Sequence, residues 1–561
     1  MTRQMKLAMA AMLLLGAATV QAQQTTDASE TVTSSNSSSD NGGAKGTTPP
    51  PAAAKPSTGG STGAQTPAAT DDGPASIKYK GVTFTPGGFV AFEGVFRDKS
   101  VNSDINTPFN SIPFPSANEG HVSELNFTGR QSRLSFLVEA PTGTVKLTGY
   151  YEMDWLGTGT SSNNNQSNSY VLRQRQIWGQ AALSSGFSVT GGQMWSLATE
   201  DRHGVDPRSE IQPQTIDSQY LVGYSWERQP GIRVQQRWGD YKTGAFSVAI
   251  AAEQAQITNF TVSSSLSSSI PTQYFFAGTG QNGGLYNSAA AVAAGNAAST
   301  AAITTYANNI LPDFLVKFAY DNPTFHAEFG GLARFLRDYY FPVTITGTAT
   351  TPVLTYVTAP YLHHTADAGG AFGDVRVYLG KFAEVAVQGM AGTGTGRYGS
   401  AQLADATLRP DETLEPIRNY HGLFSLETHI NPKFDVFAYY GGEFAERTVY
   451  MTGSGNYMGY GPENLSNAGC YALPVSGGTA GTGGNISASG TCQSPTKYIE
   501  EGMFGFQWKP IVSPRFGRLQ YSLTYSLIQR QLWAGIGSAS TPVSPRAQDS
   551  MIHIQMRYYI P

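Results

Sequence analysis

Hydrophobic and polar residues alternate with a period of two along most of the chain, from Gly87 to its end. The last eleven residues, MIHIQMRYYIP, give the clearest example, because every second residue from Ile552 to Ile560 is apolar or aromatic. An extended chain presents such residues on one side. Sixteen segments with this alternation can be placed, near residues 87–97, 126–140, 143–155, 170–182, 186–197, 224–238, 244–254, 312–320, 324–337, 365–380, 382–392, 414–430, 433–446, 497–509, 517–531 and 548–560. We therefore expect sixteen β-strands.

The connections between these segments alternate in length. The connection after each even-numbered segment is tight, as at 141–142, 321–323 and 431–432. The connection after each odd-numbered segment is long, as at 255–311 and 447–496. A soluble β-sandwich gives no reason for this sorting. Transmembrane β-barrels do, because they carry short turns on one side of the membrane and long loops on the other.

The two faces of the segments differ in charge. In the ten clearest segments, charged residues fall on one face and none falls on the apolar face. A lipid-facing Lys or Arg at the bilayer midplane costs roughly 2–4 kcal/mol, so we expect the apolar face to contact lipid. The other face would line a wet, charged interior rather than a hydrophobic core.

The final segment would then pair with the first, GGFVAFEGVF, because lipid tolerates no unpaired backbone edge. Sixteen strands leave an aqueous channel inside. The predicted fold is all-β, a 16-stranded antiparallel transmembrane β-barrel, and the simplest function is the passage of solutes.

The residues before the barrel predict two further parts. Residues 1–22 read as a signal peptide, with Arg3 and Lys6 before an apolar run and a small-residue cleavage site ending at Ala22. Residues 23–76 are rich in Ser, Thr, Ala, Gly and Pro with almost no aromatic residues, which predicts a disordered, low-complexity periplasmic spacer. The barrel domain would occupy residues 77–561, in the outer membrane of a diderm bacterium.

The composition limits which partners, cofactors and metal sites can be expected. Lys+Arg 36 against Asp+Glu 40 gives no basic excess, so we expect no nucleic-acid partner. The two cysteines, Cys470 and Cys492, would reach an oxidising compartment, where they are predicted to form a disulfide. We expect no cofactor and no metal, since the His363-His364 pair has no carboxylate or cysteine at ligand spacing.

Seven stretches, in order between residues 87 and 561, resemble the DcaP-like porins, trimeric outer-membrane channels associated with dicarboxylate uptake. They are GGFVAFEGVFRD (87–98), RQSRLSF (130–136), GGQMWS (191–196), ERQPGIRV (227–234), LPDFLVKFAY (311–320), GTGTGRY (392–398) and MRYYIP (556–561). The resemblance implies sixteen strands, a homotrimer, a third loop folded inward and a preference for small anionic solutes.

Two features depart from that family. Residues 23–76 show no heptads for its periplasmic coiled-coil extension, and the chain ends in Ile560-Pro561 rather than in an aromatic residue. The barrel-assembly machinery would then have Tyr558 and Tyr559 to recognise. Outer-membrane lipid, a homotrimer and small anions are the remaining expected partners.

Two groups of residues are candidates for lining the pore and setting its selectivity. The third long connection, 198–223, carries the charged candidates Glu200, Asp201, Arg202, His203, Asp206 and Arg208; its alternative placement is an external, solvated loop. Segments 126–140, 170–182 and 224–238 carry Arg130, Arg133, Arg173, Arg175, Arg228, Arg233 and Arg237. These arginines could form a basic wall that attracts carboxylates or phosphates. Alternatively, some of them pair with Glu152 and Asp154 on the intervening segment, which also carries Lys146.

Two other functions remain as alternatives. A barrel lipase or protease would need a Ser or Asp beside a His on the wall; His326, His421 and His429 are predicted to face inward, and no Ser–His pairing is recognisable. An adhesin or receptor would act through the 255–311 and 447–496 loops. We expect a porin without enzymatic activity, and conductance of the purified protein would separate it from both.

Overall fold

The computed structural model describes residues 76–158, 162–163, 167–257, 310–340, 343–348, 352–356, 362–411, 413–451, 457–473, 492–538 and 540–561. The chain divides into two units, residues 1–70 and 71–561, and every described residue belongs to the second. The predicted signal peptide and nearly all of the predicted spacer lie outside the described residues.

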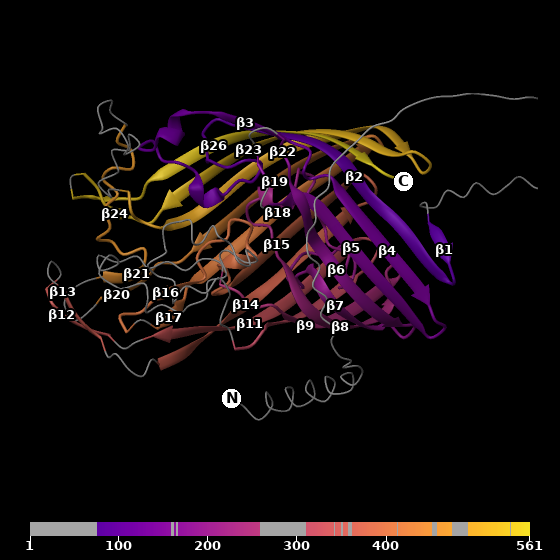
Figure 1. The fold of residues 1–561 in the computed structure, drawn as a ribbon, viewed down its shortest axis with the longest axis horizontal. Coiled ribbons are helices and arrows are strands. Elements are labelled where there is room, and N and C mark those ends of the chain that lie inside the picture. Colours follow the sequence, from indigo (N-terminus) through magenta and orange to yellow (C-terminus); the bar gives the residue numbers. More distant parts are fainter. Residues whose placement is uncertain are drawn as a thin grey trace, which may run out of the picture. The chain divides into compact units, whose positions relative to one another are not determined.

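The wall of the second unit is a closed antiparallel β-barrel (Figure 1). Its strands are β2 (Val82–Arg97), β3 (Glu124–Thr128), β4 (Arg133–Pro141), β5 (Val145–Gly157), β6 (Val171–Leu183), β7 (Phe187–Trp195), β8 (Arg228–Asp240), β9 (Gly244–Glu253), β10 (Asp313–Asp321), β11 (Phe325–Tyr340), β14 (Leu362–Leu379), β15 (Ala383–Thr393), β18 (Arg418–Asn431), β19 (Phe434–Ala445), β22 (Thr496–Ser513), β23 (Gly517–Leu532) and β26 (Arg546–Tyr559). β3 and β4 both pair with β2 and occupy one position in the wall, which therefore has sixteen positions. The predicted sixteen-stranded fold is confirmed.

The barrel closes between its first and last strands. β2 pairs with β26 from Phe89 opposite Tyr559 to Arg97 opposite Met551. β2 begins at Val82, before the predicted start at Gly87, because its first residues pair with β4 and with the short strand β1 (Ile77–Tyr79). The alternating C-terminal segment is thus held by strand pairing on both of its edges.

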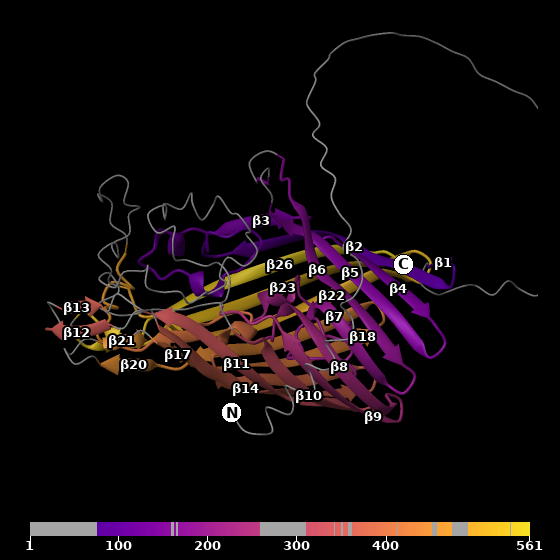
Figure 2. The ribbon, with the colours of Figure 1, turned by 60° about the horizontal axis from the view of Figure 1, so that its bottom comes forward.

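The connections are sorted between the two ends of the barrel (Figures 1 and 2). One end carries tight turns, and the C terminus lies there. The other end carries long connections with short strands, which are β12 (Val343–Gly347), β13 (Pro352–Tyr356), β16 (Ala406–Leu408), β17 (Leu414–Pro416), β20 (Thr448–Met451), β21 (Tyr457–Tyr460), β24 (Gly535–Ile536) and β25 (Pro542–Val543). Short 3-10 helices are η1 (Phe109–Ser111), η2 (Asn118–His121), η3 (Ser218–Tyr220) and η6 (Gly396–Tyr398). Among the described residues, no helix has the length and apolar character needed to cross a bilayer.

The outer face of the wall is apolar and exposed. Val375 on β14, Val387 on β15 and Phe424 on β18 lie side by side in register, and 49%, 58% and 43% of their surfaces are exposed. The inner face carries buried charges, including Glu93, Lys317 and Arg376. This polarity is the reverse of a soluble barrel and fits a wall in contact with lipid.

The interior is more crowded than the sequence suggested. Parts of the connections 98–123, 196–227 and 394–417 are buried inside the barrel. Leu197, Val205 and Tyr398 from two of them pack with inner-face residues such as Ala249 and Leu315. We expected a wet interior without a hydrophobic core. This is only partly correct, because the inward connections bring apolar side chains into the barrel.

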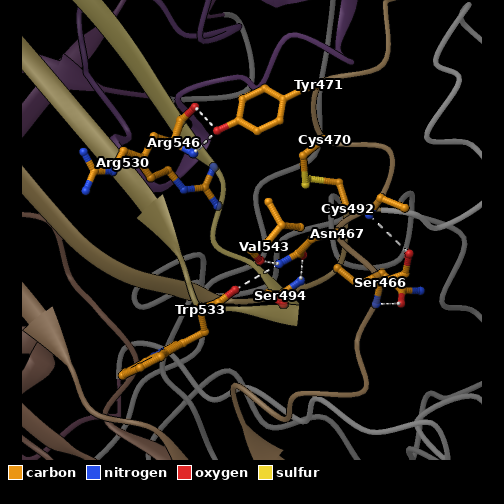
Figure 3. Close-up of a disulfide and its surroundings, with 12 residues drawn as sticks. Ser466, Asn467, Cys470, Tyr471, Cys492, Ser494, Arg530, Trp533, Val543 and Arg546 are labelled. Atoms are coloured by element: carbon orange, nitrogen blue, oxygen red, sulfur yellow. Dashed lines mark hydrogen bonds between the residues drawn. A yellow bond between two sulfur atoms is a disulfide. The ribbon is translucent and has the colours of Figure 1, made fainter. Parts of the chain in front are cut away.

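A disulfide between Cys470 and Cys492 is present, as predicted (Figure 3). Cys470 is fully buried, and the neighbouring Asn467 side chain donates to the carbonyls of Trp533 and Val543 at 2.9 and 3.0 Å. Ser494 N donates to Asn467 Oδ1 at 3.2 Å. The disulfide thus closes the connection between β21 and β22, and the Asn467 hydrogen bonds hold it against the connection between β23 and β26.

Changing Val387 to Lys should destabilise the barrel, because the ammonium group would have to leave water at a lipid-facing position. We expect a loss of roughly 2–4 kcal/mol in the free energy of unfolding, measured by urea unfolding in lipid vesicles. Val122→Lys, at a 56% exposed residue in a connection, is the matched control and should change stability little. Equal losses in both variants would contradict a lipid-facing β15.

Replacing both cysteines, Cys470→Ser with Cys492→Ser, should loosen the disulfide region without opening the barrel. Closing a chain segment of this length stabilises by about 3 kcal/mol in the chain-entropy model. Hydrogen exchange at the Ser494 amide should accelerate accordingly, while amides of the β23–β26 pairing keep their protection. Unchanged exchange at Ser494 would show that the hydrogen bonds of Asn467 alone hold this region.

Candidate functional site

The connection between β7 and β8, residues 196–227, crosses the interior and contacts several parts of the wall. Lys317 on β10 donates to Asp201 Oδ2 and to the Thr199 carbonyl, both at 2.8 Å. Arg376 on β14 donates to Glu200 at 2.8 Å. Farther along, Gln214 N donates to the hydroxyl of Tyr439 on β19 at 2.9 Å. We name residues 196–227 the inward segment.

Carboxylates of the wall hold the backbone of the inward segment. Glu253 accepts from Leu197 N at 2.8 Å, and Glu501 accepts from Val222 N at 2.8 Å. Glu443 accepts from Gly223 N at 3.0 Å. A buried backbone N–H group needs a hydrogen-bond partner, and a carboxyl oxygen of the wall supplies one in each case. These acidic residues of the inner face are therefore anchors for a segment whose regular secondary structure, in the described residues, is limited to the short 3-10 helix η3.

Gly223 shows how closely this segment approaches the wall. Its φ is +85°, and a Cβ there would lie 2.1 Å from the Gly422 carbonyl oxygen of β18. Only glycine fits both the conformation and the space.

Arginines and carboxylates gather where β4, β5 and β6 meet the inward segment. Arg175 donates to Glu152 and Asp154 at 2.8 Å and lies 3.5 Å from Asp217. Arg173 contacts Asp154 at 2.7 Å. Arg133 lies 3.6 Å from Glu152 and 3.8 Å from Asp217. We name these residues, with Arg228, the arginine cluster. Pairing of some arginines with Glu152 and Asp154, the alternative left open by the sequence, is thus observed.

Arg228, the first residue of β8, is the least neutralised member of this cluster. Its guanidinium carbon lies 4.9 Å from the ring centre of Trp195 and 5.4 Å from that of Trp226. Its Nη1 is buried and has no hydrogen-bond partner within the described part of the chain. Four arginines therefore face three carboxylates, and the cluster keeps an excess positive charge.

The pKa values of two carboxyl groups in the inward segment are shifted in opposite directions. Burial alone would raise the pKa of Asp217, but the charges of Arg175, Arg133 and Arg228 hold it well below its usual range. Burial, reinforced by the neighbouring Asp201 carboxylate, raises the pKa of Glu210 to about 8. Asp217 thus remains an anion at any physiological pH, whereas Glu210 carries a proton at neutral pH.

The other predicted site residues are distributed along the barrel. Arg130 pairs with Asp104 and stacks 3.9 Å from the ring centre of Tyr170. Arg202 pairs with Glu384 on β15 at 3.0 Å. The remaining contacts are Arg233 with the Val205 and Trp195 carbonyls, Arg237 with Asp206, Arg208 with the Tyr150 ring, His203 with the Tyr241 ring and Lys146 with Glu139. Their role in lining a permeation path stays a prediction.

Several functional residues were missed from the sequence. Asp217 and Glu210 lie within the connection that supplied other candidates, and their charge could have identified them from the sequence. Ser225 Oγ lies 2.9 Å from His421 Nε2, a pairing that no sequence spacing indicates. A hydrolase would need a third group on His421 Nδ1, and no hydrogen bond from that nitrogen to a carboxylate occurs among the described residues. The pair ties the inward segment to β18.

Comparison with known proteins supports the fold. No family model and no curated protein matches the sequence. A crystal structure of the outer membrane channel DcaP of Acinetobacter baumannii matches with a TM-score of 0.52 at 12% identity, covering 87% of this chain and 100% of that chain. The chain has the fold of the DcaP channel.

Two further structures match less well. Salmonella typhi OmpF in complex with daunomycin gives a TM-score of 0.42 at 8% identity, over 87% of this chain and 100% of that chain. An anion-selective porin from Comamonas acidovorans gives 0.40 at 9% identity, over 85% and 100%. At such identities the DcaP-like fold is what the comparisons establish, so the site must be argued from this chain's own residues.

Stability of the inward segment should fall as pH rises from about 4.5 to 8. Across this range the folded segment keeps the proton of Glu210 that the unfolded segment releases. The amide of Ile211, which donates to the Glu200 carbonyl at 2.9 Å, reports this opening by hydrogen exchange. Glu210→Gln should reduce the pH dependence, whereas Glu463→Gln, at an exposed residue, should retain it in full. Persistence of the full dependence in Glu210→Gln would assign it to another group.

Proposed function

We propose that this protein is an outer-membrane porin, a passive diffusion channel for small hydrophilic solutes that favours anions such as dicarboxylates. The apolar outer face and the charged inner face support a membrane channel over a soluble barrel. The inward segment narrows the interior, so residues beside it would set selectivity. No enzymatic activity is part of the proposal.

The single observation that carries the anion preference is the excess charge of the arginine cluster. Arg133, Arg173, Arg175 and Arg228 face Glu152, Asp154 and Asp217, and Arg228 has a buried donor without a partner among the described residues. Guanidinium groups bind carboxylates through paired N–H donors. A solute with two carboxylates could engage more than one of these arginines in turn.

We place the protein in the outer membrane of a diderm bacterium as a homotrimer, with residues 23–76 in the periplasm. Export into an oxidising compartment agrees with the disulfide. Outer-membrane lipid would surround the apolar face, and the barrel-assembly machinery would insert the chain. Chemical crosslinking of intact outer membranes tests the trimer, and a band no larger than one chain would exclude it.

The selectivity proposal predicts that Arg228→Gln lowers the anion preference of the channel. A unit charge about 4 Å from a solute in water contributes about 1 kcal/mol, so its removal should reduce the anion-to-cation permeability ratio about two- to fivefold after salt screening. Reversal potentials across a salt gradient in planar bilayers measure this ratio.

Two further variants serve as charge controls. Arg515→Gln removes the same charge from an exposed turn between β22 and β23 and should leave the ratio unchanged. Asp217→Asn removes an anion from the cluster and should raise the ratio. Cation preference of the unmodified protein, or equal effects of Arg228→Gln and Arg515→Gln, would contradict the proposal.

A further inference from the structure

A second charged cluster lies on the inner wall where β10, β11 and β14 adjoin the inward segment. It contains His326 and Glu328 on β11, Asp374 on β14, and Asp321 and Lys317 on β10. One potential ligand atom from each of His326, Glu328 and Asp374 lies within 4.8 Å of the other two, and all three residues are buried. This is a convergent set of one imidazole and two carboxyl groups.

Strand register forces the two carboxyl groups together. Glu328 is directly opposite Asp374 in the β11–β14 pairing. One carboxyl oxygen of each residue lies within 4.8 Å of one of the other. Like charges directly opposite on neighbouring strands are destabilising, and two ionised carboxylates cannot bond to each other. Positive charge beside the pair is therefore stabilising: Lys317 supplies it at Glu328, and a shared proton or a metal ion would supply it between the two carboxyl groups.

His326, Glu328 and Asp374 each direct one possible ligand atom toward a common centre. In His326 and Glu328, the second polar atom of the side chain is held by a neighbouring residue. His326 Nδ1 lies 2.8 Å from Asp321 Oδ1, which leaves Nε2 directed toward Glu328 Oε2 at 3.1 Å and Asp374 Oδ1 at 4.0 Å. Lys317 donates to Glu328 Oε1 at 2.8 Å, which leaves Oε2 for the site. A carboxylate on the outer nitrogen of an imidazole is the usual support of a metal-binding histidine.

Asp374 supplies an independent sign of a missing ligand. The residue is 6% exposed, and its Oδ1, the atom facing His326, is buried without a hydrogen-bond partner in the described structure. A buried carboxyl oxygen without a hydrogen-bond partner is costly. Nothing protein-derived that the structure describes fills this coordination position.

The local charge also favours a divalent cation. Asp201, Asp321, Glu328 and Asp374 supply four carboxyl groups. Among the described residues, Lys317 is the only permanently charged side chain that pairs with any of them. A neutral His326 would leave a large negative excess in a buried site, which a bound divalent ion would offset.

We propose that His326 Nε2, Glu328 and Asp374 bind a divalent cation of the Zn²⁺ class, with Asp321 as the positioning residue of His326. One nitrogen and two carboxylate oxygens suit Zn²⁺ better than Ca²⁺ or Mg²⁺, which prefer oxygen ligands alone. The ion would join β11 to β14 beside the contact of Lys317 with Asp201, and so stiffen the support of the inward segment. This inference does not depend on the proposed channel function.

The test is a Zn²⁺ titration of the full-length protein, purified in detergent and stripped with a chelator. Equilibrium dialysis with elemental analysis should find one ion per chain, and Zn²⁺ should raise the thermal unfolding temperature where the same concentration of Ca²⁺ does not. His326→Gln and Asp374→Asn should each weaken binding at least about tenfold and abolish the thermal shift. Asp321→Asn should weaken binding about ten- to a hundredfold while all three ligands remain.

His429→Gln is the matched control. His429 on β18 also has two carboxylate neighbours, Asp435 at 3.2 Å and Glu384 at 3.6 Å, but belongs to no such three-ligand set in the described residues. It should retain binding and the thermal shift. Circular dichroism and heat-dependent electrophoretic migration confirm that each variant is folded. Absence of Zn²⁺ binding in the unmodified protein, or undiminished binding in both folded ligand variants, would overturn the proposal and leave a shared proton between Glu328 and Asp374.

Discussion

The structure depends on one constraint, that a backbone surrounded by hydrocarbon has no solvent to satisfy its N–H and C=O groups. Every strand of the wall must therefore be paired on both edges, and the last must meet the first. The β2–β26 pairing provides this from Phe89 opposite Tyr559 to Arg97 opposite Met551. Closure leaves one face of the wall to lipid and the other to the interior, and side-chain alternation places Ile554 outside and His553 inside.

Because the apolar face points outward, the inner face can carry charged residues. These residues fall into two groups. Glu253, Glu443 and Glu501 hold backbone N–H groups of the inward segment. The arginine cluster instead keeps more positive than negative groups. The three glutamates each accept a backbone N–H group, whereas Arg228 Nη1 in the cluster is buried without a hydrogen-bond partner among the described residues. Under the proposed channel function, the arginines in excess would act on passing solutes, whereas the glutamates hold the inward segment.

The wall could be predicted from sequence because period-two alternation is a local property. It placed all sixteen strand positions. It missed the start of β2, which pairing with β4 sets, the break that divides the predicted segment 126–140 into β3 and β4, and the separation of β17 from β18 within 414–430. The interior could not be predicted in the same way. Alternation says that Glu152 and Arg175 face inward, but their 2.8 Å contact depends on a register shift near Glu152 in the β5–β6 pairing. Asp217 reaches them only because a segment without periodicity folds across the barrel.

The two charged clusters show why net charge describes such a protein poorly. The whole chain has Lys+Arg 36 and Asp+Glu 40, which is close to neutral. Yet β4–β6 and the start of β8 carry a positive excess, whereas β10, β11 and β14 carry a negative one around Glu328 and Asp374. In the water of a channel, charges farther away than about 8 Å are largely screened at physiological salt. A solute would therefore respond to whichever sector it passes, and a bound divalent ion in the negative sector would leave the arginine cluster as the dominant field.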